Sequence, residues 1–138
     1  FTNGVRVVDM AKGYSTLANG GVYNDRTCII KIEHEHDGEL TKDLKPSAHQ
    51  VYRDDSAFML TDVLKGTFTA AHGTGQGLGL DNDMPAAGKT GTTKAAGYCL
   101  IMAEKDDSDR EFISVVLKSD SRPHLYDNMT NIISKIVK

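Results

Sequence analysis

The run Lys89-Thr90-Gly91-Thr92 brings together a cation, two hydroxyl groups and a residue without a side chain, a combination suited to one edge of an active site. Small residues precede the run and an apolar stretch follows it, so we expect it to lie on a strand. Alternate side chains of a strand share a face, so Lys89 and Gly91 would face one way and the two threonines the other. A bulge or local twist near Gly91 would be needed for Lys89 and Thr92 to contact one ligand. The glycine would also let a bound peptide approach and pair with the strand backbone.

Two nucleotide-binding interpretations of the glycine-rich segments fail on spacing. A phosphate-binding loop would need glycine five residues before Gly88-Lys89, but that position is Asp83, whose charge would repel phosphate. Residues 73–79 neither follow an expected strand nor open an expected helix, so they do not match a dinucleotide-binding loop. We interpret them as an approach to the strand that carries Lys89.

A cluster of histidines and acids in the expected hairpin has side chains that can bind metals. His34 and His36 would share a strand face and could hold a metal together with Glu33 or Asp37. Solvated hairpin tips have the same composition. The sequence therefore predicts no metal site and no cofactor.

The periodicity of apolar residues predicts helices packed on an antiparallel sheet, an α+β fold. The second helix should begin with Asp54 and Asp55 at the positive end of its dipole. The three strands at the C-terminal side are short and closely spaced, which is typical of a meander. In order, the expected elements are a helix over 7–18, a hairpin with a strand over 27–32 and an Asp-Gly turn at 36–38, a helix over 54–68, the strand of Lys89, strands over 98–103 and 112–117, and a helix over 125–136.

The composition is that of an ordinary globular protein. The length, residues 1–138, is that of one domain. Its net charge of −3 supplies no basic surface for phosphates, which argues against nucleic-acid binding. No apolar run is as long as a membrane span. Cys28 and Cys99 each fall in an expected strand, and we expect buried free thiols there rather than a disulfide.

Several ordered segments resemble the transpeptidase domain of penicillin-binding proteins. Up to Thr93 the match is to the bifunctional class A enzymes, and after Thr93 the chain looks more like D-alanyl-D-alanine carboxypeptidases. Both share the serine β-lactamase and penicillin-binding transpeptidase fold, of which this chain would be the C-terminal portion. The matching segments are residues 8–11, 14–23, the helix over 57–66, Gly73-Thr74-Gly75, and Met84 through Thr93.

The resemblance implies action on D-Ala-D-Ala stem peptides of peptidoglycan, with β-lactams as trapping ligands. Lys89 would be the cation for the substrate carboxylate, and the hydroxyls of Thr90 and Thr92 would be further contacts beside Gly91. The nucleophile of the family, a Ser-x-x-Lys serine, is missing, since none of the eight serines has lysine three residues on. Tyr126-Asp127-Asn128 matches a Tyr-x-Asn variant, but it follows Lys-Thr-Gly instead of preceding it, so we interpret it as the start of a helix with exposed polar groups.

This chain alone is therefore expected to be inactive unless a segment carrying the serine is supplied. The alternatives are a non-catalytic peptide- or protein-binding module and a fragment of a carboxypeptidase. The resemblance also implies an extracytoplasmic, cell-envelope location. The family takes two further strands from its N-terminal half, so the sheet should keep an open edge that allows self-association.

Overall fold

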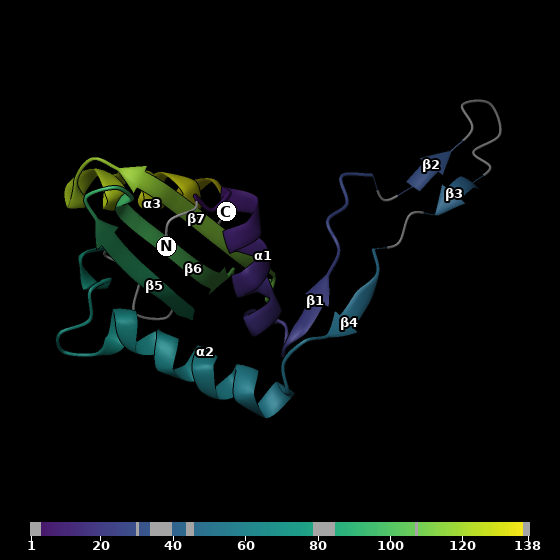
Figure 1. Ribbon diagram of the computed structural model, residues 1–138, viewed down its shortest axis with the longest axis horizontal. Helices are drawn as coiled ribbons and strands as arrows, with labels where there is room; N and C mark the ends of the chain where they lie inside the picture. Colours follow the sequence, from purple (N-terminus) through teal and green to yellow (C-terminus); the bar gives the residue numbers. More distant parts are fainter. Residues whose placement is uncertain are drawn as a thin grey trace.

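The computed structural model describes residues 4–29, 31–33, 40–43, 46–78, 85–106 and 108–136. Helices and strands confirm the predicted α+β class (Figure 1). Along the chain they are α1 (Val7–Ala18), β1 (Val22–Asn24), β2 (Lys31–Glu33), β3 (Leu40–Asp43), β4 (Ala48–Gln50), α2 (Asp54–Thr69), the 3-10 helix η1 (Gln76–Leu78), β5 (Ala86–Thr93), β6 (Gly97–Lys105), β7 (Glu111–Ser119) and α3 (Arg122–Ile136).

A three-stranded antiparallel sheet, in the order β5-β6-β7, forms the centre of the molecule, as the sequence predicted. The central strand β6 is the most buried because it has a neighbour on both sides. Its residues Leu100 and Met102 point to one face, where they pack with apolar side chains of α3. Ile101 points to the opposite face, over which α1 crosses, while α2 runs beside β5 (Figure 1). The strand that carries Lys89, β5, therefore has α2 along its outer side. On its other side lies β6, whose residues Leu100 and Met102 form part of the core with α3.

The end of α1 fixes the path of the chain that follows. Gly20 and Gly21 both adopt positive φ, at 60° and 85°, as glycine commonly does where a helix ends. The carbonyl oxygen of Gly21 accepts hydrogen bonds from the backbone N–H groups of Val51 and Tyr52, just before α2 begins. A Cβ on Gly21 would lie 2.3 Å from the carbonyl oxygen of Tyr52, so only glycine allows this close contact.

Between α1 and α2 the chain forms an arm that projects from the sheet and helices (Figure 1). The single hairpin strand predicted over 27–32 is wrong in its extent. Instead β1 pairs with β4 near the base and β2 pairs with β3 farther out, and the described residues 25–29 between β1 and β2 are not strand. Cys28 lies in that interval and is exposed, which corrects the prediction of a buried thiol, because no described part of the chain covers it. The predicted turn at 36–38 and the histidines His34 and His36 fall outside the described residues.

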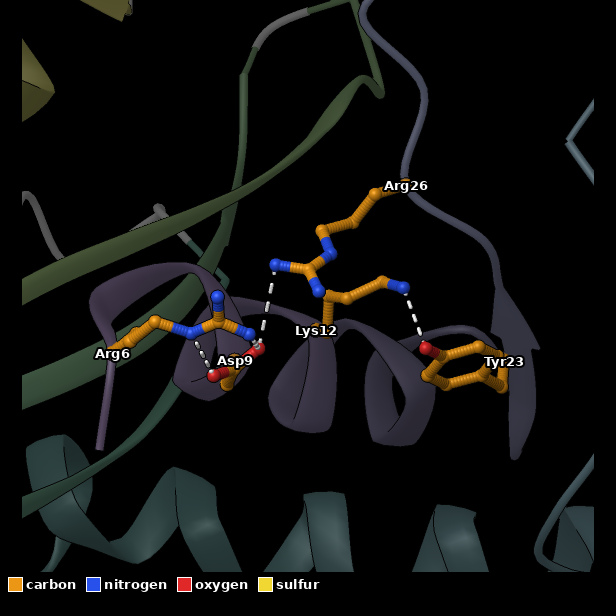
Figure 2. Close-up of polar contacts among 5 residues, drawn as sticks. All are labelled: Arg6, Asp9, Lys12, Tyr23 and Arg26. Carbon is orange, nitrogen blue, oxygen red and sulfur yellow. Dashed lines mark hydrogen bonds and ion pairs between the residues drawn. The ribbon is translucent and has the colours of Figure 1, made fainter. Parts of the chain in front are cut away.

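Polar contacts hold the base of the arm against α1 (Figure 2). The Lys12 ammonium donates a hydrogen bond to the Tyr23 hydroxyl at 2.6 Å, and Arg26 lies 3.5 Å from the carboxylate of Asp9. Arg6 also donates to Asp9, at 2.7 Å, from the residue before the helix. These groups are largely exposed, so solvent weakens the ion pairs and they contribute little to stability.

Candidate functional site

Strand β5 carries all four predicted site residues and is the first strand of the sheet. Its pairing with β6 runs without interruption from Ala86, opposite Glu104, to Thr93, opposite Gly97. There is consequently no bulge in β5, and the local distortion expected near Gly91 is absent. Lys89 and the two threonines keep the alternate directions of a regular strand.

The backbone of β5 presents polar groups at its outer edge. The carbonyl oxygen of Gly88 accepts a hydrogen bond from the hydroxyl of Thr67 on α2 at 2.6 Å, away from β6. In an antiparallel strand the N–H and C=O groups two and four residues farther on point the same way. Those groups belong to Thr90 and Thr92, so they also point to the outer edge of β5.

Lys89 reaches this edge with its side chain. The residue is exposed, and its ammonium donates to the carbonyl oxygen of Thr90, one of the edge groups. A flexible lysine thus brings its charge to the edge without a bulge in the strand. A Cβ placed on Gly91 would meet no atom within 4 Å, so the space beside it is open.

The two threonines differ in their surroundings. The Thr90 hydroxyl is 2.6 Å from the hydroxyl of Thr74, in the turn that follows α2. Thr92 is exposed. The arrangement of cation, hydroxyl and outward-pointing backbone groups can bind an extended peptide with an anionic end, but it contains no nucleophile. Ser134, adjacent to Lys135, donates instead to the carbonyl oxygen of Asn131 within α3.

The sequence interpretation missed the contacts that Tyr126 makes in this region. Tyr126 is half-buried, and its hydroxyl donates to the carbonyl oxygen of Thr74 at 2.5 Å, so its interpretation as an exposed polar group at a helix start is wrong. A Cβ on Gly77 would lie 2.8 Å from the Tyr126 ring, which shows how closely the ring packs there. Fifty-two residues separate Tyr126 from Thr74, and no local pattern reveals such a contact.

A buried carboxyl group lies elsewhere in the sheet. Glu104 is 1% exposed; one of its oxygens accepts a hydrogen bond from the Ser114 hydroxyl, and the other has no partner among the residues that the structure describes. Burial raises the pKa of Glu104 to about 7, against the lowering effect of the Ser114 hydrogen bond. Glu104 pairs with Ala86 at the far end of β5, so we assign it no role at Lys89.

A groove lies at the opposite edge of the sheet. It is lined by Val7 of α1, by Val115 to Leu117 of β7, and by α3 residues including Ile132 and Lys135. Within the described part of the chain, β7 pairs only with β6, so its outer edge is open as predicted. Lys89 does not line this groove, because it lies on β5 at the other edge of the sheet.

The described residues also bear on metal binding and on membrane insertion. No three metal-binding side chains of His, Cys, Asp or Glu gather there. None of the helices found in the described ranges is both long and apolar enough to cross a membrane.

Comparisons with known proteins give a consistent result. Residues 5–130 match the family model described as the penicillin binding protein transpeptidase domain. Penicillin-binding protein 1A/1B of Bacillus subtilis (strain 168) is 40% identical over 91 residues, which are 66% of this chain and 9% of the relative. Penicillin-binding protein 1A of Streptococcus oralis is 39% identical over 84 residues, 61% of this chain and 12% of the relative.

Two solved structures share the fold. The D,D-transpeptidase domain of a peptidoglycan glycosyltransferase from Eggerthella lenta superposes with a TM-score of 0.74 at 18% identity. Penicillin-binding protein A from M. tuberculosis, solved as an imipenem acyl-enzyme complex, superposes with a TM-score of 0.71 at 16% identity. Each comparison covers 96% of this chain and 32% of the solved chain. The chain thus spans about a tenth of the curated relatives and about a third of the solved chains.

Proposed function

Because the chain belongs to the penicillin-binding protein transpeptidase domain family, we propose that it supplies the substrate-binding strand of a D,D-transpeptidase that cross-links peptidoglycan. The substrate would be the D-Ala-D-Ala end of a stem peptide, and β-lactams would occupy the same position. The protein would act outside the cytoplasm, in the cell envelope.

The outer edge of β5 beyond Gly88 carries this proposal. An extended peptide can pair with the outward backbone groups of Thr90 and Thr92, as in other cases of strand addition. The Lys89 ammonium already lies at that edge and would bind the terminal carboxylate, with the Thr90 hydroxyl as a second donor. Hydrogen bonds to a charged group stabilise by about 1.5–3 kcal/mol each, so the carboxylate would dominate recognition. Gly91 leaves room for the peptide backbone.

The acyl-transfer step would depend on a segment that this chain does not contain. No serine here is followed three residues later by lysine, so the Ser-x-x-Lys nucleophile would come from another part of the domain. The outward face of α2 supports such a partner: Phe58, Met59 and Val63 are 68%, 68% and 72% exposed there. A helix that is apolar on both its inner and its outer side is normally covered on both. We propose that the nucleophile-bearing segment covers this face.

A titration followed by NMR tests the binding role. The ¹⁵N-labelled chain is titrated with N-acetyl-D-alanyl-D-alanine, and the amides of residues 89–92 should shift. The matched ligand N-acetyl-D-alanyl-D-alaninamide lacks the carboxylate, and it should bind about tenfold more weakly, as expected for the loss of one charge-assisted hydrogen bond. Lys89→Ala should remove the difference between the two ligands. Equal binding of both ligands to the wild type, or shifts confined to other strands, would contradict the proposal.

Labelling with a fluorescent penicillin tests whether this chain lacks the nucleophile. The chain alone should not be labelled covalently, whereas a mixture with a transpeptidase segment that carries Ser-x-x-Lys should be. Covalent labelling of the chain alone would show that it contains a nucleophile after all. Binding of the dipeptide without labelling of the mixture would favour a non-catalytic peptide-binding module.

A further inference from the structure

We propose that Thr74 and Tyr126 are positioning residues, which hold the Thr90 hydroxyl so that its proton points to the substrate carboxylate. This inference rests on the proposed function, because it concerns how the same strand binds its ligand. Thr74 lies in the turn after α2, Thr90 on β5 and Tyr126 in the first turns of α3. The hydroxyl groups of Thr74 and Thr90 are 2.6 Å apart, and the Tyr126 hydroxyl donates to the backbone carbonyl oxygen of Thr74 at 2.5 Å.

The turn that carries Thr74 is held from two sides. On one side, the backbone N–H of Gly75 donates to the carbonyl oxygen of Thr67 in α2 at 2.8 Å. On the other, the Tyr126 hydroxyl donates to the carbonyl oxygen of Thr74, and the Tyr126 ring packs against Gly77. The Thr74 side chain therefore projects from a backbone whose position is fixed on both flanks.

The direction of the hydrogen bonds follows from the number of protons. A threonine hydroxyl has one proton to donate and two lone pairs to accept with. If the Thr90 hydroxyl donates to a carboxylate, the bond between the two threonines requires Thr74 to be the donor and Thr90 the acceptor. A hydroxyl that accepts a hydrogen bond is polarised and becomes a stronger donor itself. Thr74 would thus select the rotamer of Thr90 and strengthen its bond to the ligand.

Thr90 needs this support more than Lys89 does. An ammonium has three protons and binds a carboxylate in many orientations, whereas the single hydroxyl proton must be aimed. Without Thr74, the Thr90 side chain would rotate about χ1 and its ordering would cost binding free energy. Preorganisation by a neighbouring side chain avoids that cost.

Three variants test the inference in the same ¹⁵N-labelled chain. Thr74→Val removes the hydroxyl at nearly constant shape, and Thr74→Ser keeps it. Tyr126→Phe removes the bond to the Thr74 carbonyl and keeps the ring. We expect Thr74→Val to weaken N-acetyl-D-alanyl-D-alanine binding about tenfold, Tyr126→Phe about threefold, and Thr74→Ser less than about twofold, from the free energies of neutral and charge-assisted hydrogen bonds. Thr69→Val and Tyr52→Phe, which change the same groups away from Thr90, should leave binding unchanged.

The ligand without a carboxylate separates positioning from a general structural effect. Thr74→Val should leave the affinity for N-acetyl-D-alanyl-D-alaninamide unchanged, because that ligand lacks the charged acceptor. Equal weakening of both ligands, or equal effects of the valine and serine variants, would overturn the inference.

A second readout requires no ligand. Three-bond scalar couplings should report a single χ1 rotamer for Thr90 in the wild type and averaged rotamers in Thr74→Val. If the wild type binds neither dipeptide, the proposed function fails, and these couplings still decide whether Thr74 positions Thr90. An averaged Thr90 in the wild type, or no change in Thr74→Val, would refute the positioning.

Discussion

Replacing Glu104 with glutamine should change how the stability of the chain depends on pH. Glu104 is buried on β6, and the loss of solvation raises its pKa from 4.5 to about 7, although the Ser114 hydrogen bond acts in the opposite direction. The unfolded chain would titrate near the ordinary value. Below about pH 4.5 the group is protonated in both states and carries no penalty. As the pH rises toward 7, the unfolded state gains the ionised form that the folded state resists, so the free energy of unfolding falls.

The size of the effect follows from the difference in pKa. A shift of about 2.5 units corresponds to about 3 kcal/mol between pH 4.5 and pH 8, at about 1.36 kcal/mol per unit. Glutamine has nearly the same shape and no charge, so Glu104→Gln should lose this part of the pH dependence. Its amide lacks a full set of partners, which costs about 1 kcal/mol at every pH. The variant should therefore be no more stable than the wild type at pH 4.5 and about 2 kcal/mol more stable at pH 8.

Urea unfolding of both proteins, followed by circular dichroism from pH 4.5 to 8, measures this difference. Glu111→Gln is the matched control, because Glu111 is an exposed carboxylate that pairs with Lys105 at 3.3 Å on the neighbouring strands. Its difference from the wild type should stay below about 1 kcal/mol. An NMR titration of the Glu104 side chain should give a midpoint near 7. Parallel stability profiles of the wild type and Glu104→Gln would refute the view that the carboxyl is ionised at a cost in the folded state.

Two further predictions concern packing and the uncovered face of α2. A Cβ on Gly88 would lie 2.4 Å from the carbonyl oxygen of Ile101, so Gly88→Ala should reduce the free energy of unfolding by about 2 kcal/mol in urea titrations, whereas Gly91→Ala should change it by less than about 0.5 kcal/mol. Equal effects of the two alanines would contradict the packing at Gly88. The exposed Phe58 and Val63 should cause concentration-dependent association in sedimentation, and Phe58→Lys with Val63→Lys should reduce it more than Thr69→Lys does. A wild type that sediments as a monomer at all concentrations would contradict association through the exposed apolar face of α2.

The sequence was sufficient where structure follows from local periodicity. The apolar spacing in α1 and α3 and the acids that open α2 placed the helices within a few residues, because each helix buries one face against the same sheet. The short polar turn after β6 and the glycine at 97, with φ of 64°, likewise mark the ends of strands in the meander. The predicted position of the strand that carries Lys89 was confirmed for the same reason.

The sequence was insufficient where the structure depends on which other part of the protein covers or contacts a side chain. The β-branched residues after Thr27 predicted a continuous strand, but no described part of the chain buries Ile29, which is 52% exposed. The outward apolar side chains of α2 were not recognised, because the pattern shows only that Ala57 and Leu64 share a face and not that a second face is uncovered. Tyr126 was misjudged because its contact with Thr74 joins residues far apart in the sequence.

The geometry of β5 also bears on how such a chain would work with a partner. The proposed recognition of a substrate through Lys89, Thr90 and the strand backbone would use groups that lie on this chain. Acyl transfer needs in addition a nucleophile held within about 3.5 Å of the scissile carbonyl, and a misplacement of about 1 Å can cost a factor of about 100 in rate. The segment that supplies the serine must therefore be fixed relative to β5. The helix best placed to do this is α2, whose inner side binds β5 through Thr67 and Gly88 and whose outer side is apolar and exposed.

If α2 couples the serine-bearing segment to β5 in this way, Thr67→Val should slow penicillin labelling of the mixture more than it weakens dipeptide binding to the chain alone. Equal losses in both assays would instead mean that Thr67 supports only the strand.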